Sequence, residues 1–393
     1  MKIAILTSGI LPIPAVQGGA VESLVDAYLD YNDKHHLHDI TVYSIAHSNT
    51  KGHPALRSVA NHYHYTDTSS LVAKVRKNIH RMLSPKGFYH YSIEYYFEQA
   101  ARHIGSHDYD MVIIENRPGF AMKLSAMTSA RIVHHLHNDI LNSSTPHCQM
   151  LYDAAHRIVT VSDYIAQRVR TINANDTKCI TVHNGIDTRH FAPGLSAPAD
   201  RERYGIGADD FVLIFTGRII PEKGIGQLVE AMCLLKEHHH IKLLVLGSAF
   251  YANDNTEGSF IHQLKEKARS LGDRIVFTGY APYADMPSML HMADVAVLPS
   301  TWEEPFGLTC AEAMAAGLPL ITTRQGGIPE VTPPDAALLL EADDQLPQRL
   351  ASAILLLEAD RERCRHMGKA ALQASQQFSK DTYAENFFKA ISI

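Results

Sequence analysis

Residues 295–322, VAVLPSTWEEPFGLTCAEAMAAGLPLIT, contain the pattern from which the fold class of this chain can be predicted. The segment begins and ends with short apolar runs, Val295–Pro299 and Leu318–Thr322. Between them, small apolar residues beginning near Gly307 predict a tightly packed helix that ends before Pro319. Short, continuous apolar runs are typical of strands buried on both faces, as in parallel sheets covered by helices. The segment therefore predicts a strand–helix–strand unit of an α/β domain.

The same alternation of apolar runs and amphipathic stretches recurs along the rest of the chain. A length of 393 residues is too great for one ordinary core. Between the halves, Phe191–Arg203 contains two prolines and a glycine and has no regular period. We therefore expect two doubly wound, Rossmann-like domains, 1–192 and 193–375, with closing helices over 346–366 and 368–390. Further strands are expected at Lys2–Leu6, Ile40–Ile45, Met111–Glu115, Arg131–Leu136, Arg157–Val161, Lys178–Val182, Phe211–Phe215, Ile241–Leu246 and Arg274–Phe277.

The composition is that of an ordinary globular protein, with 46% hydrophobic and 20% charged residues. The five cysteines are widely spaced and include no Cys-x-x-Cys pair, which favours a reducing compartment over a disulfide framework or a zinc site. The N-terminal apolar segment is too short for a secretory signal, and no apolar run approaches the roughly 18–20 residues of a spanning helix. We therefore expect a cytoplasmic protein.

Residues 71–90 form a basic segment without any acidic residue. Its cationic residues are Lys74, Arg76, Lys77, Arg81 and Lys86. Such a segment can bind anionic lipid or an acidic acceptor, and a solvated helix face explains it equally well. We hypothesise peripheral contact with the inner face of a membrane through this segment.

Two turns that follow strands are candidate anion sites. In doubly wound sheets, ligands bind beyond the carboxyl ends of the strands, often at helix N-termini. After the first strand, Gly18 and Gly19 open a helix and let the backbone approach a ligand; a purely structural turn is the alternative. After the first strand of the second half, Arg218 and Lys223 flank a loop and can neutralise a diphosphate; a solvated basic loop is the alternative.

Two glutamates follow the strand Val295–Pro299. Glu304 lies in the loop, and Glu312 lies about two turns into the apolar helix. A carboxylate in such a helix is costly unless it accepts hydrogen bonds, and sugar hydroxyl groups are suitable donors. The alternatives are a Glu304 that caps the helix and a Glu312 that is paired within the protein.

Together these residues resemble glycosyltransferase family 4. Glu304 and Glu312 match its E-x7-E signature, and Arg218 and Lys223 stand in a segment similar to its G-R-x(4)-K-G donor loop. Members of the family have the GT-B fold, in which two Rossmann-like domains face each other across a cleft. The resemblance therefore implies that fold for this chain.

Further segments extend the resemblance over nearly the whole chain. Gly18-Gly19 resembles the glycine loop of the family, Asn184–Asp187 its interdomain N-G-[VI]-D motif, and Gly326–Glu330 its G-G-x-x-E segment. Only the region from about 48 to 105 matches no family pattern. By the same resemblance, the C-terminal helix, 376–393, would pack back on the first domain.

The resemblance also implies roles for individual residues. Glu312 would accept hydrogen bonds from the ribose of a nucleotide, and Glu304 would contact hydroxyl groups of the transferred sugar. Arg218 and Lys223 would hold the diphosphate, and Tyr280 would lie near the base. The remaining donor contacts would come from Gly18, Gly19, Phe306, Gly307, Leu308 and Thr309.

His137 ends the run His134-His135-Leu136-His137 at the end of a first-half strand. In the family, a histidine at the matching position faces the sugar near the reacting carbon. The implied catalytic residues are therefore His137, Arg218, Lys223 and Glu304. A packed core histidine and a metal cluster are the alternatives for His137. Because His134 would point away from the face shared by His135 and His137, ligation by all three is hard to arrange, and we regard the first two as structural.

The resemblance implies a retaining glycosyltransferase. It would move a hexose-type sugar from a nucleotide sugar, most commonly a UDP-sugar, to a saccharide or lipid-linked saccharide of cell-surface polysaccharide assembly. No metal and no cofactor are expected, because the two cations and the helix dipoles would supply the positive charge. No nucleic-acid partner is expected. A sugar-nucleotide 2-epimerase of related architecture and a non-catalytic nucleotide-sugar binding protein are the alternatives.

Overall fold

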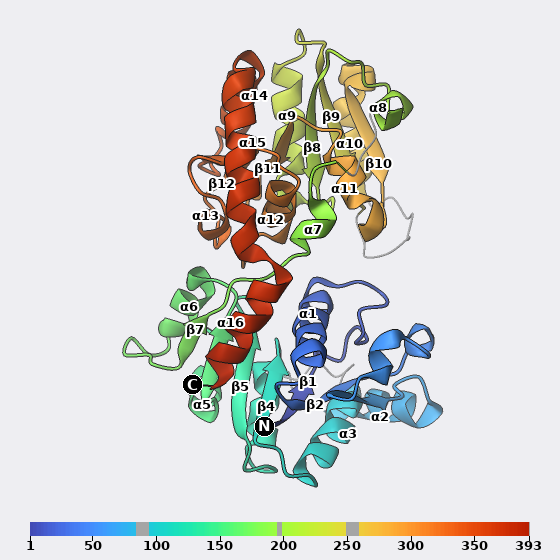
Figure 1. Ribbon diagram of the computed structural model, residues 1–393, viewed down its shortest axis with the longest axis vertical. Helices are drawn as coiled ribbons and strands as arrows, with labels where there is room; N and C mark the ends of the chain where they lie inside the picture. Colours follow the sequence, from blue (N-terminus) through green and yellow to red (C-terminus); the bar gives the residue numbers. More distant parts are fainter. Residues whose placement is uncertain (84–93, 195–198, 249–258, 393) are drawn as a thin grey trace. The chain divides into compact units, whose positions relative to one another are not determined.

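The computed structural model of the protein describes residues 1–83, 94–194, 199–248 and 259–392. The chain forms two compact units: unit 1 is Met1–Gly185 with Lys380–Ile393, and unit 2 is Ile186–Ser379 (Figure 1). The limits expected from the sequence, after residues 192 and 375, differ from these by a few residues. The difference arises because the Ile186 N–H donates to the Phe378 carbonyl over 2.8 Å and Ile186 forms a parallel bridge with Ser379.

Unit 1 contains a parallel sheet with the strand order β3-β2-β1-β4-β5-β6-β7. Its described strands are β1 (Lys2–Leu6), β2 (Asp39–Ile45), β3 (Asn61–Thr66), β4 (Met111–Glu115), β5 (Arg131–Leu136), β6 (Arg157–Thr160) and β7 (Cys179–Thr181). Successive side chains of a strand point to opposite faces. Ile3 and Ile5 of β1 accordingly belong to one core, and Ala4 and Leu6 belong to another. Helices therefore cover both faces of this sheet.

The C-terminal helix of the chain completes one of these two cores. The described helices of unit 1 are α1 (Ala20–His35), α2 (Leu71–Leu83), α3 (Glu94–Gly105), α4 (Ala121–Leu124), α5 (Cys148–Ala154), α6 (Asp163–Arg170) and α16 (Lys380–Ser392). Tyr383, Phe387 and Phe388 of α16 are buried, and the Phe387 ring stacks on Tyr28 of α1 with centroids 4.4 Å apart. The apolar stripe of α16 is thus part of the unit 1 core.

Unit 2 contains a second parallel sheet, with the strand order β10-β9-β8-β11-β12-β13. Its described strands are β8 (Phe211–Thr216), β9 (Ile241–Leu246), β10 (Ile275–Gly279), β11 (Val295–Leu298), β12 (Leu320–Thr323) and β13 (Ala337–Leu340). Its described helices are α7 (Thr188–Phe191), α8 (Ala199–Arg203), α9 (Ile225–Leu234), α10 (Ser259–Ala268), α11 (Met286–Leu290), α12 (Leu308–Ala315), α13 (Ile328–Val331), α14 (Leu346–Ala359) and α15 (Arg361–Ser375). The prediction of two doubly wound parallel domains is confirmed.

The structure corrects the expected elements in two places. Strands β3 and β13 were not expected, and each pairs with a single neighbour at an edge of its sheet. The two closing helices predicted over 346–366 and 368–390 are three helices, α14, α15 and α16. The first break lies at Asp360, whose carboxylate caps α15 by accepting the Arg363 N–H over 2.9 Å.

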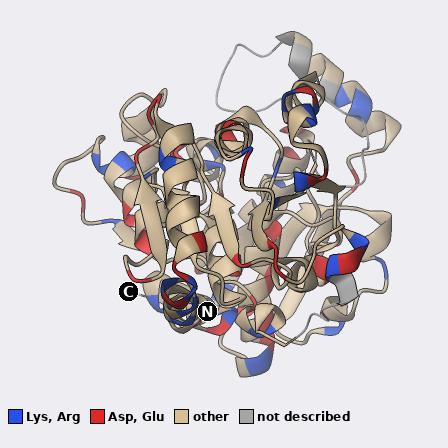
Figure 2. Cartoon of the chain, turned by 90° about the horizontal axis from the view of Figure 1, so that it is seen from above, with Lys and Arg blue, Asp and Glu red and all other residues tan. Residues whose placement is uncertain are grey.

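Charged residues lie mainly on the helices and loops, while the strands are largely free of them (Figure 2). This distribution matches strands that are covered on both faces. None of the helices in the described ranges is both long and apolar enough to span a membrane.

Candidate functional site

The loop after β8 brings Lys223 to the carboxyl end of the unit 2 sheet. A single 3-10 turn, Pro221–Lys223, precedes Gly224, which begins α9 with a φ of 71°. A Cβ atom at position 224 would lie 1.8 Å from the carbonyl oxygen of Pro299, so only glycine fits this close approach between two strand ends. Lys223 is thereby fixed beside the loop that follows β11.

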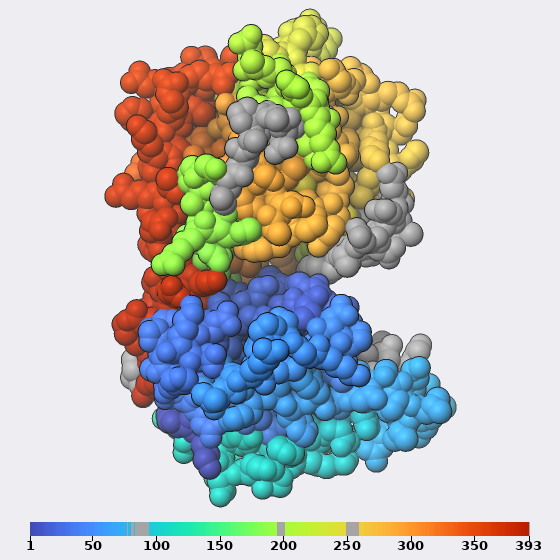
Figure 3. Space-filling model, turned by 45° about the vertical axis from the view of Figure 1, so that its right-hand side comes forward, coloured from blue at the N-terminus to red at the C-terminus, as the bar shows by residue number. Residues whose placement is uncertain are grey.

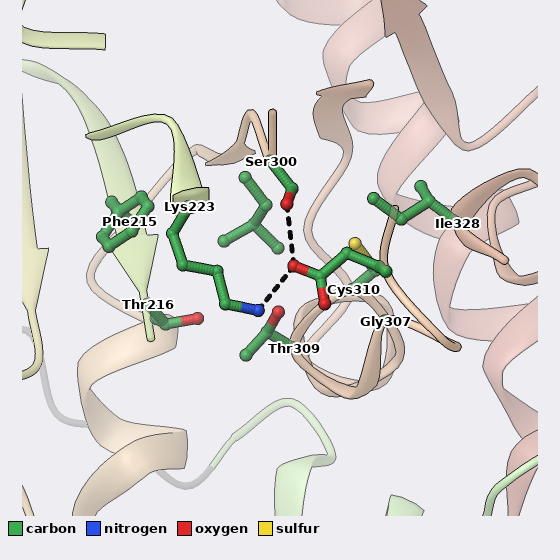
Figure 4. Close-up of a pocket in the computed structure, with 10 residues that line it drawn as sticks. Phe215, Thr216, Lys223, Ser300, Gly307, Thr309, Cys310 and Ile328 are labelled. Atoms are coloured by element: carbon green, nitrogen blue, oxygen red, sulfur yellow. Dashed lines mark hydrogen bonds and ion pairs between the residues drawn. The ribbon is translucent and has the colours of Figure 1, made fainter. Parts of the chain in front are cut away.

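Lys223 and Glu304 form the centre of a small polar pocket in unit 2. The Lys223 Nζ lies 2.5 Å from Glu304 Oε1, and the Ser300 hydroxyl donates to the same oxygen over 2.8 Å (Figure 4). Thr216 and Thr309 also line this pocket. Glu304 is 8% exposed, and its ion pair with Lys223 offsets the cost of burying the carboxylate. The structure therefore brings together two of the predicted catalytic residues.

Glu312 lies in α12 with different surroundings. Within the described part of the chain, no hydrogen-bond or ion-pair partner contacts its carboxylate. Burial raises the pKa of Glu312 to about 8. Desolvation together with the charge of Glu312 raises the pKa of Tyr283, whose ring stacks on His190 with centroids 5.3 Å apart. Among the described residues, nothing uses the hydrogen-bonding capacity of the Glu312 carboxylate, which lies close enough to Tyr283 to raise the pKa of that residue.

The other predicted donor contacts of unit 2 lie at the ends of strands or at the start of α12. Arg218 is half-buried in the turn after β8, and Tyr280 is 46% exposed directly after β10. Gly307 begins α12, so Leu308 and Thr309 form its first turn. The Phe306 ring is buried and packs edge-on against Phe378, with centroids 5.6 Å apart. Any contact of Phe306 with a donor would therefore come from its backbone.

In unit 1, the glycine pair opens α1 as predicted. Gly18 and Gly19 have φ values of 75° and 105°, in the region that favours glycine. A Cβ atom on Gly19 would lie 2.2 Å from Oε2 of Glu22, a buried glutamate in the first turn of α1. The Asp26 carboxylate of the same helix accepts the Ala15 N–H over 2.8 Å and so holds the preceding loop.

His137 follows β5 and contacts Glu115, the last residue of β4. His137 Nε2 lies 2.8 Å from Glu115 Oε2, and His135 Nδ1 lies 3.0 Å from the same oxygen. The Tyr28 hydroxyl donates to the other oxygen, Oε1, over 2.7 Å. His134 points elsewhere, with Nε2 3.1 Å from the Leu151 carbonyl oxygen, as expected for its alternating position on the strand.

Glu115, His135 and His137 form the group of described residues whose ligand atoms could reach one metal ion. In this structure the contacts within the group are hydrogen bonds: His137 Nε2 lies 2.8 Å from Glu115 Oε2, and His135 Nδ1 lies 3.2 Å from Glu115 Oε1. We therefore interpret the group as a buried hydrogen-bonded network.

The predicted site residues divide between the two units. Unit 2 holds Arg218, Lys223, Tyr280, Glu304, Phe306, Gly307, Leu308, Thr309 and Glu312, and unit 1 holds Gly18, Gly19 and His137. Sequence reasoning did not single out Ser300, Tyr283 or Glu115. The one available signal was the position of Glu115, a carboxylate at the carboxyl end of a buried strand. Of the basic segment 71–90, residues 84–90 and the side chains of Lys77 and Arg81 lie outside what the structure describes.

Two family models match the chain. "Glycosyl transferases group 1" matches residues 196–374, and "Glycosyltransferase Family 4" matches residues 35–190. A protein of Bacillus subtilis (strain 168) named "Putative glycosyltransferase YtcC" is 29% identical to this chain, over 98% of this chain and 90% of its own length. The two family models match almost entirely different units: the first matches unit 2, and the second matches mainly unit 1.

Solved structures with the same fold cover nearly all of the chain. The crystal structure of Anabaena Alr3699/HepE in complex with UDP-glucose has a TM-score of 0.72 and 20% identity, and the alignment covers 100% of this chain and 99% of that one. The structure of a glycosyltransferase from Rickettsia africae ESF-5 has a TM-score of 0.76 and 18% identity, covering 99% and 97%. At these identities the likeness shows the fold.

Proposed function

We propose that this chain, which carries the two domains of a GT-B glycosyltransferase, is a retaining hexosyltransferase that takes its sugar from a UDP-sugar. The observation that carries the proposal is the arrangement of Lys223, Glu304 and Glu312 at the carboxyl end of the unit 2 sheet. The cation suits a diphosphate, and the two carboxylates suit hydroxyl groups. UDP-glucose is the ligand named for the Anabaena structure of the same fold, which supports a donor of this class.

The proposed reaction needs a stabilised leaving group. Departure of UDP places negative charge on the diphosphate, which Lys223, Arg218 and the N-terminus of α12 are suited to stabilise. In this structure Lys223 is paired with Glu304, so a diphosphate would compete for this cation and release the carboxylate toward a sugar hydroxyl. The acceptor would then attack an oxocarbenium-like centre from the face that UDP leaves. The protein contributes positioning and charge rather than a nucleophile.

We further propose that the reaction requires no metal, because these cationic groups supply the charge. Dialysis against EDTA should leave kcat and KM within about twofold of the untreated enzyme, since removal of an essential ion costs far more. The measurement is initial rate before and after dialysis, with Mg²⁺, Mn²⁺ or Zn²⁺ added back. A loss that one of these ions restores would contradict the proposal.

The donor site is tested by thermal stabilisation with a panel of nucleoside diphosphates and nucleotide sugars. At a hundredfold excess over Kd, a ligand adds about 2.7 kcal/mol of stability, or roughly 5–10 °C in Tm for a domain of this size. UDP should stabilise the wild type, and Lys223→Ala and Glu312→Ala should abolish the shift. Lys236→Ala is the matched control, because this exposed lysine of unit 2 lies outside the pocket. No shift with any nucleotide would overturn the donor site.

Product analysis separates the proposed reaction from its alternatives. Transfer to a saccharide acceptor with the anomeric configuration kept, read by NMR, is the expected result. Conversion of the donor without an acceptor would favour an epimerase. Binding without turnover would favour a nucleotide-sugar binding protein.

The acceptor side of the proposal involves α2. Leu71, Val75, Ile79 and Met82 form one face of this helix and are 50–84% exposed, while Ala73 on another face is fully buried. The apolar face of an amphipathic helix therefore points to solvent, and Figure 3 shows the light-blue segment that contains α2 at the outside of unit 1. No acidic residue lies between Asp67 and Glu94. An apolar face flanked by basic residues suits an anionic bilayer. We propose peripheral contact there, with a saccharide or lipid-linked saccharide as acceptor.

Membrane contact is tested by co-sedimentation with liposomes of phosphatidylcholine alone or with 30% phosphatidylglycerol. We expect binding to the anionic liposomes, and at least a fivefold loss in Val75→Ser/Ile79→Ser and in Lys74→Ser/Arg76→Ser. Leu356→Ser, an exposed leucine of α14, is the control and should bind as the wild type does. Equal sedimentation of all four proteins would remove this part of the proposal.

A further inference from the structure

Glu115 is a fully buried carboxylate that receives three hydrogen-bond donors. They are the Tyr28 hydroxyl, 2.7 Å from Oε1, His135 Nδ1, 3.2 Å from the same oxygen, and His137 Nε2, 2.8 Å from Oε2. Burial alone would raise the pKa of Glu115, but the interaction with His135 and the hydrogen bonds from both histidines hold that pKa well below its usual range. Glu115 is therefore ionised and has no proton to donate.

An ionised Glu115 fixes where the proton of His137 lies. Because the carboxylate can only accept, His137 Nε2 must carry the hydrogen of the 2.8 Å contact. Burial and the neighbouring His135 lower the pKa of His137 to about 4, although Glu115 acts in the opposite direction. The imidazole is therefore neutral near pH 7, and its Nδ1 has a free lone pair.

The Nδ1 atom of His137 is an unused hydrogen-bond acceptor. It is buried and has no partner in the described part of the protein, and His137 as a whole is 6% exposed. The His137 backbone is held as well, because its N–H donates to the Asn116 side chain over 3.1 Å. Buried acceptors normally have a donor, so this atom is ready for a donor group that the described residues do not supply.

We propose that Glu115 is a positioning residue that holds His137 in the Nε2–H tautomer, so that Nδ1 stays an acceptor for a sugar hydroxyl group presented to unit 1. This inference rests on the proposed function, because it takes a sugar as the ligand. Glu115 acts only through His137. His135 and Tyr28 donate hydrogen bonds to the Glu115 carboxylate and so fill its other acceptor positions. They thereby help to orient the carboxylate toward the His137 imidazole.

A purely structural network makes a different prediction. If Glu115 served only the core, its substitution would lower stability and would affect kcat no more than any equally destabilising change. Glu115→Gln separates the two roles, because the amide keeps the size of the side chain but turns an N–H toward His137. His137 Nε2 would then accept a hydrogen bond from this N–H, and the imidazole proton would move to Nδ1. A protonated Nδ1 cannot accept a hydrogen bond from a hydroxyl group.

The test combines spectroscopy with kinetics on the full-length protein. Long-range ¹H–¹⁵N correlation spectra of protein labelled with ¹⁵N-histidine report the tautomer, and the His137 signals are those absent in His137→Gln. We expect Nε2–H in the wild type and Nδ1–H in Glu115→Gln, with kcat reduced about 10²-fold and KM changed less. In the His137→Gln background, Glu115→Gln should cause no further loss of kcat. Glu94→Gln, a buried glutamate of α3, is the control and should keep both tautomer and kcat.

Two results would overturn the inference. One is an Nδ1–H tautomer in the wild type, which is read without any substrate and so is independent of whether the chain is a transferase. The other is an equal loss of kcat from Glu115→Gln in the presence and in the absence of His137. Failure of the proposed function would instead show as a wild-type protein without turnover whose His137 still has the Nε2–H tautomer.

Discussion

Glu304 and Glu312 belong to one sequence motif, yet their carboxylates lie in different surroundings. Glu304 is paired with Lys223 and Ser300, whereas Glu312 has no partner within the described residues and its pKa is raised to about 8 by burial. The unfolded chain gives up this proton near pH 4.5, and the native protein keeps it until about pH 8. The contribution of Glu312 to the free energy of unfolding is therefore fully present below pH 4.5 and is lost as the pH rises toward 8.

Glu312→Gln should remove this loss. The variant and the wild type should differ little in unfolding free energy at pH 4.5, and the variant should become the more stable of the two by pH 8.5. An advantage of about 1 kcal/mol would appear as roughly 2–4 °C in Tm. Urea denaturation at pH 4.5, 6, 7.5 and 8.5 measures the difference, with the exposed Glu202→Gln as control. If the difference in unfolding free energy between the variant and the wild type stayed constant from pH 4.5 to 8.5, Glu312 would be ionised in the native protein at neutral pH.

At the scale of single residues, the sequence indicates which residues lie at strand ends and turns, because spacing along the chain is enough to assign them to these positions. Lys223 and Glu304 were predicted in this way, and the structure places them in contact. Glu115 and Tyr283 were not predicted. Their surroundings come from segments far away in the sequence, His135 and His137 for the first and His190 for the second.

At the scale of elements, α16 is held by its aromatic face. The Phe387 ring is fully buried and stacks on Tyr28, and its centroid lies 4.8 Å from that of the His135 ring. Phe387→Ala should cost about 3–5 kcal/mol in the unfolding free energy of unit 1. The exposed neighbour Asn386→Ala should change it by no more than about 0.5 kcal/mol. Guanidinium unfolding followed by near-UV circular dichroism gives both values, and a cost below 1 kcal/mol for Phe387→Ala would mean that α16 contributes little to this core.

The central strands were predictable because they are continuous apolar runs, whereas the edge strand β3 was harder to recognise for a physical reason. β3 has the sequence NHYHYT and pairs only with β2, so its side chains need not be apolar on both faces. β13 also lies at an edge, but its run ALLL is continuous and as long as β11 and β12, which were predicted, so neither its pattern nor its length explains why it was not expected. A search for continuous apolar runs therefore finds the middle of each sheet and misses an edge strand of mixed polarity such as β3.

At the scale of the whole molecule, the two units have separate cores, and unit 1 is built from two segments that are far apart in the sequence. Unit 2 is one continuous segment, Ile186–Ser379, whereas unit 1 depends on α16, which returns from the far end of the sequence. Chains with two cores need not unfold in a single cooperative step. We therefore expect calorimetry to resolve two transitions, one for each unit.

Each transition should respond to its own perturbation. UDP at a hundredfold excess over Kd should raise the unit 2 transition by roughly 5–10 °C, because Lys223, Glu304 and Glu312 all lie in that unit. Phe387→Ala should lower the unit 1 transition and leave the other in place. Scans of both proteins with and without UDP provide the measurement, and Asn386→Ala serves as the control. A single transition that both perturbations move together would instead mean that the units unfold as one body, and the donor would then stabilise α16 and the His137 network as strongly as its own pocket.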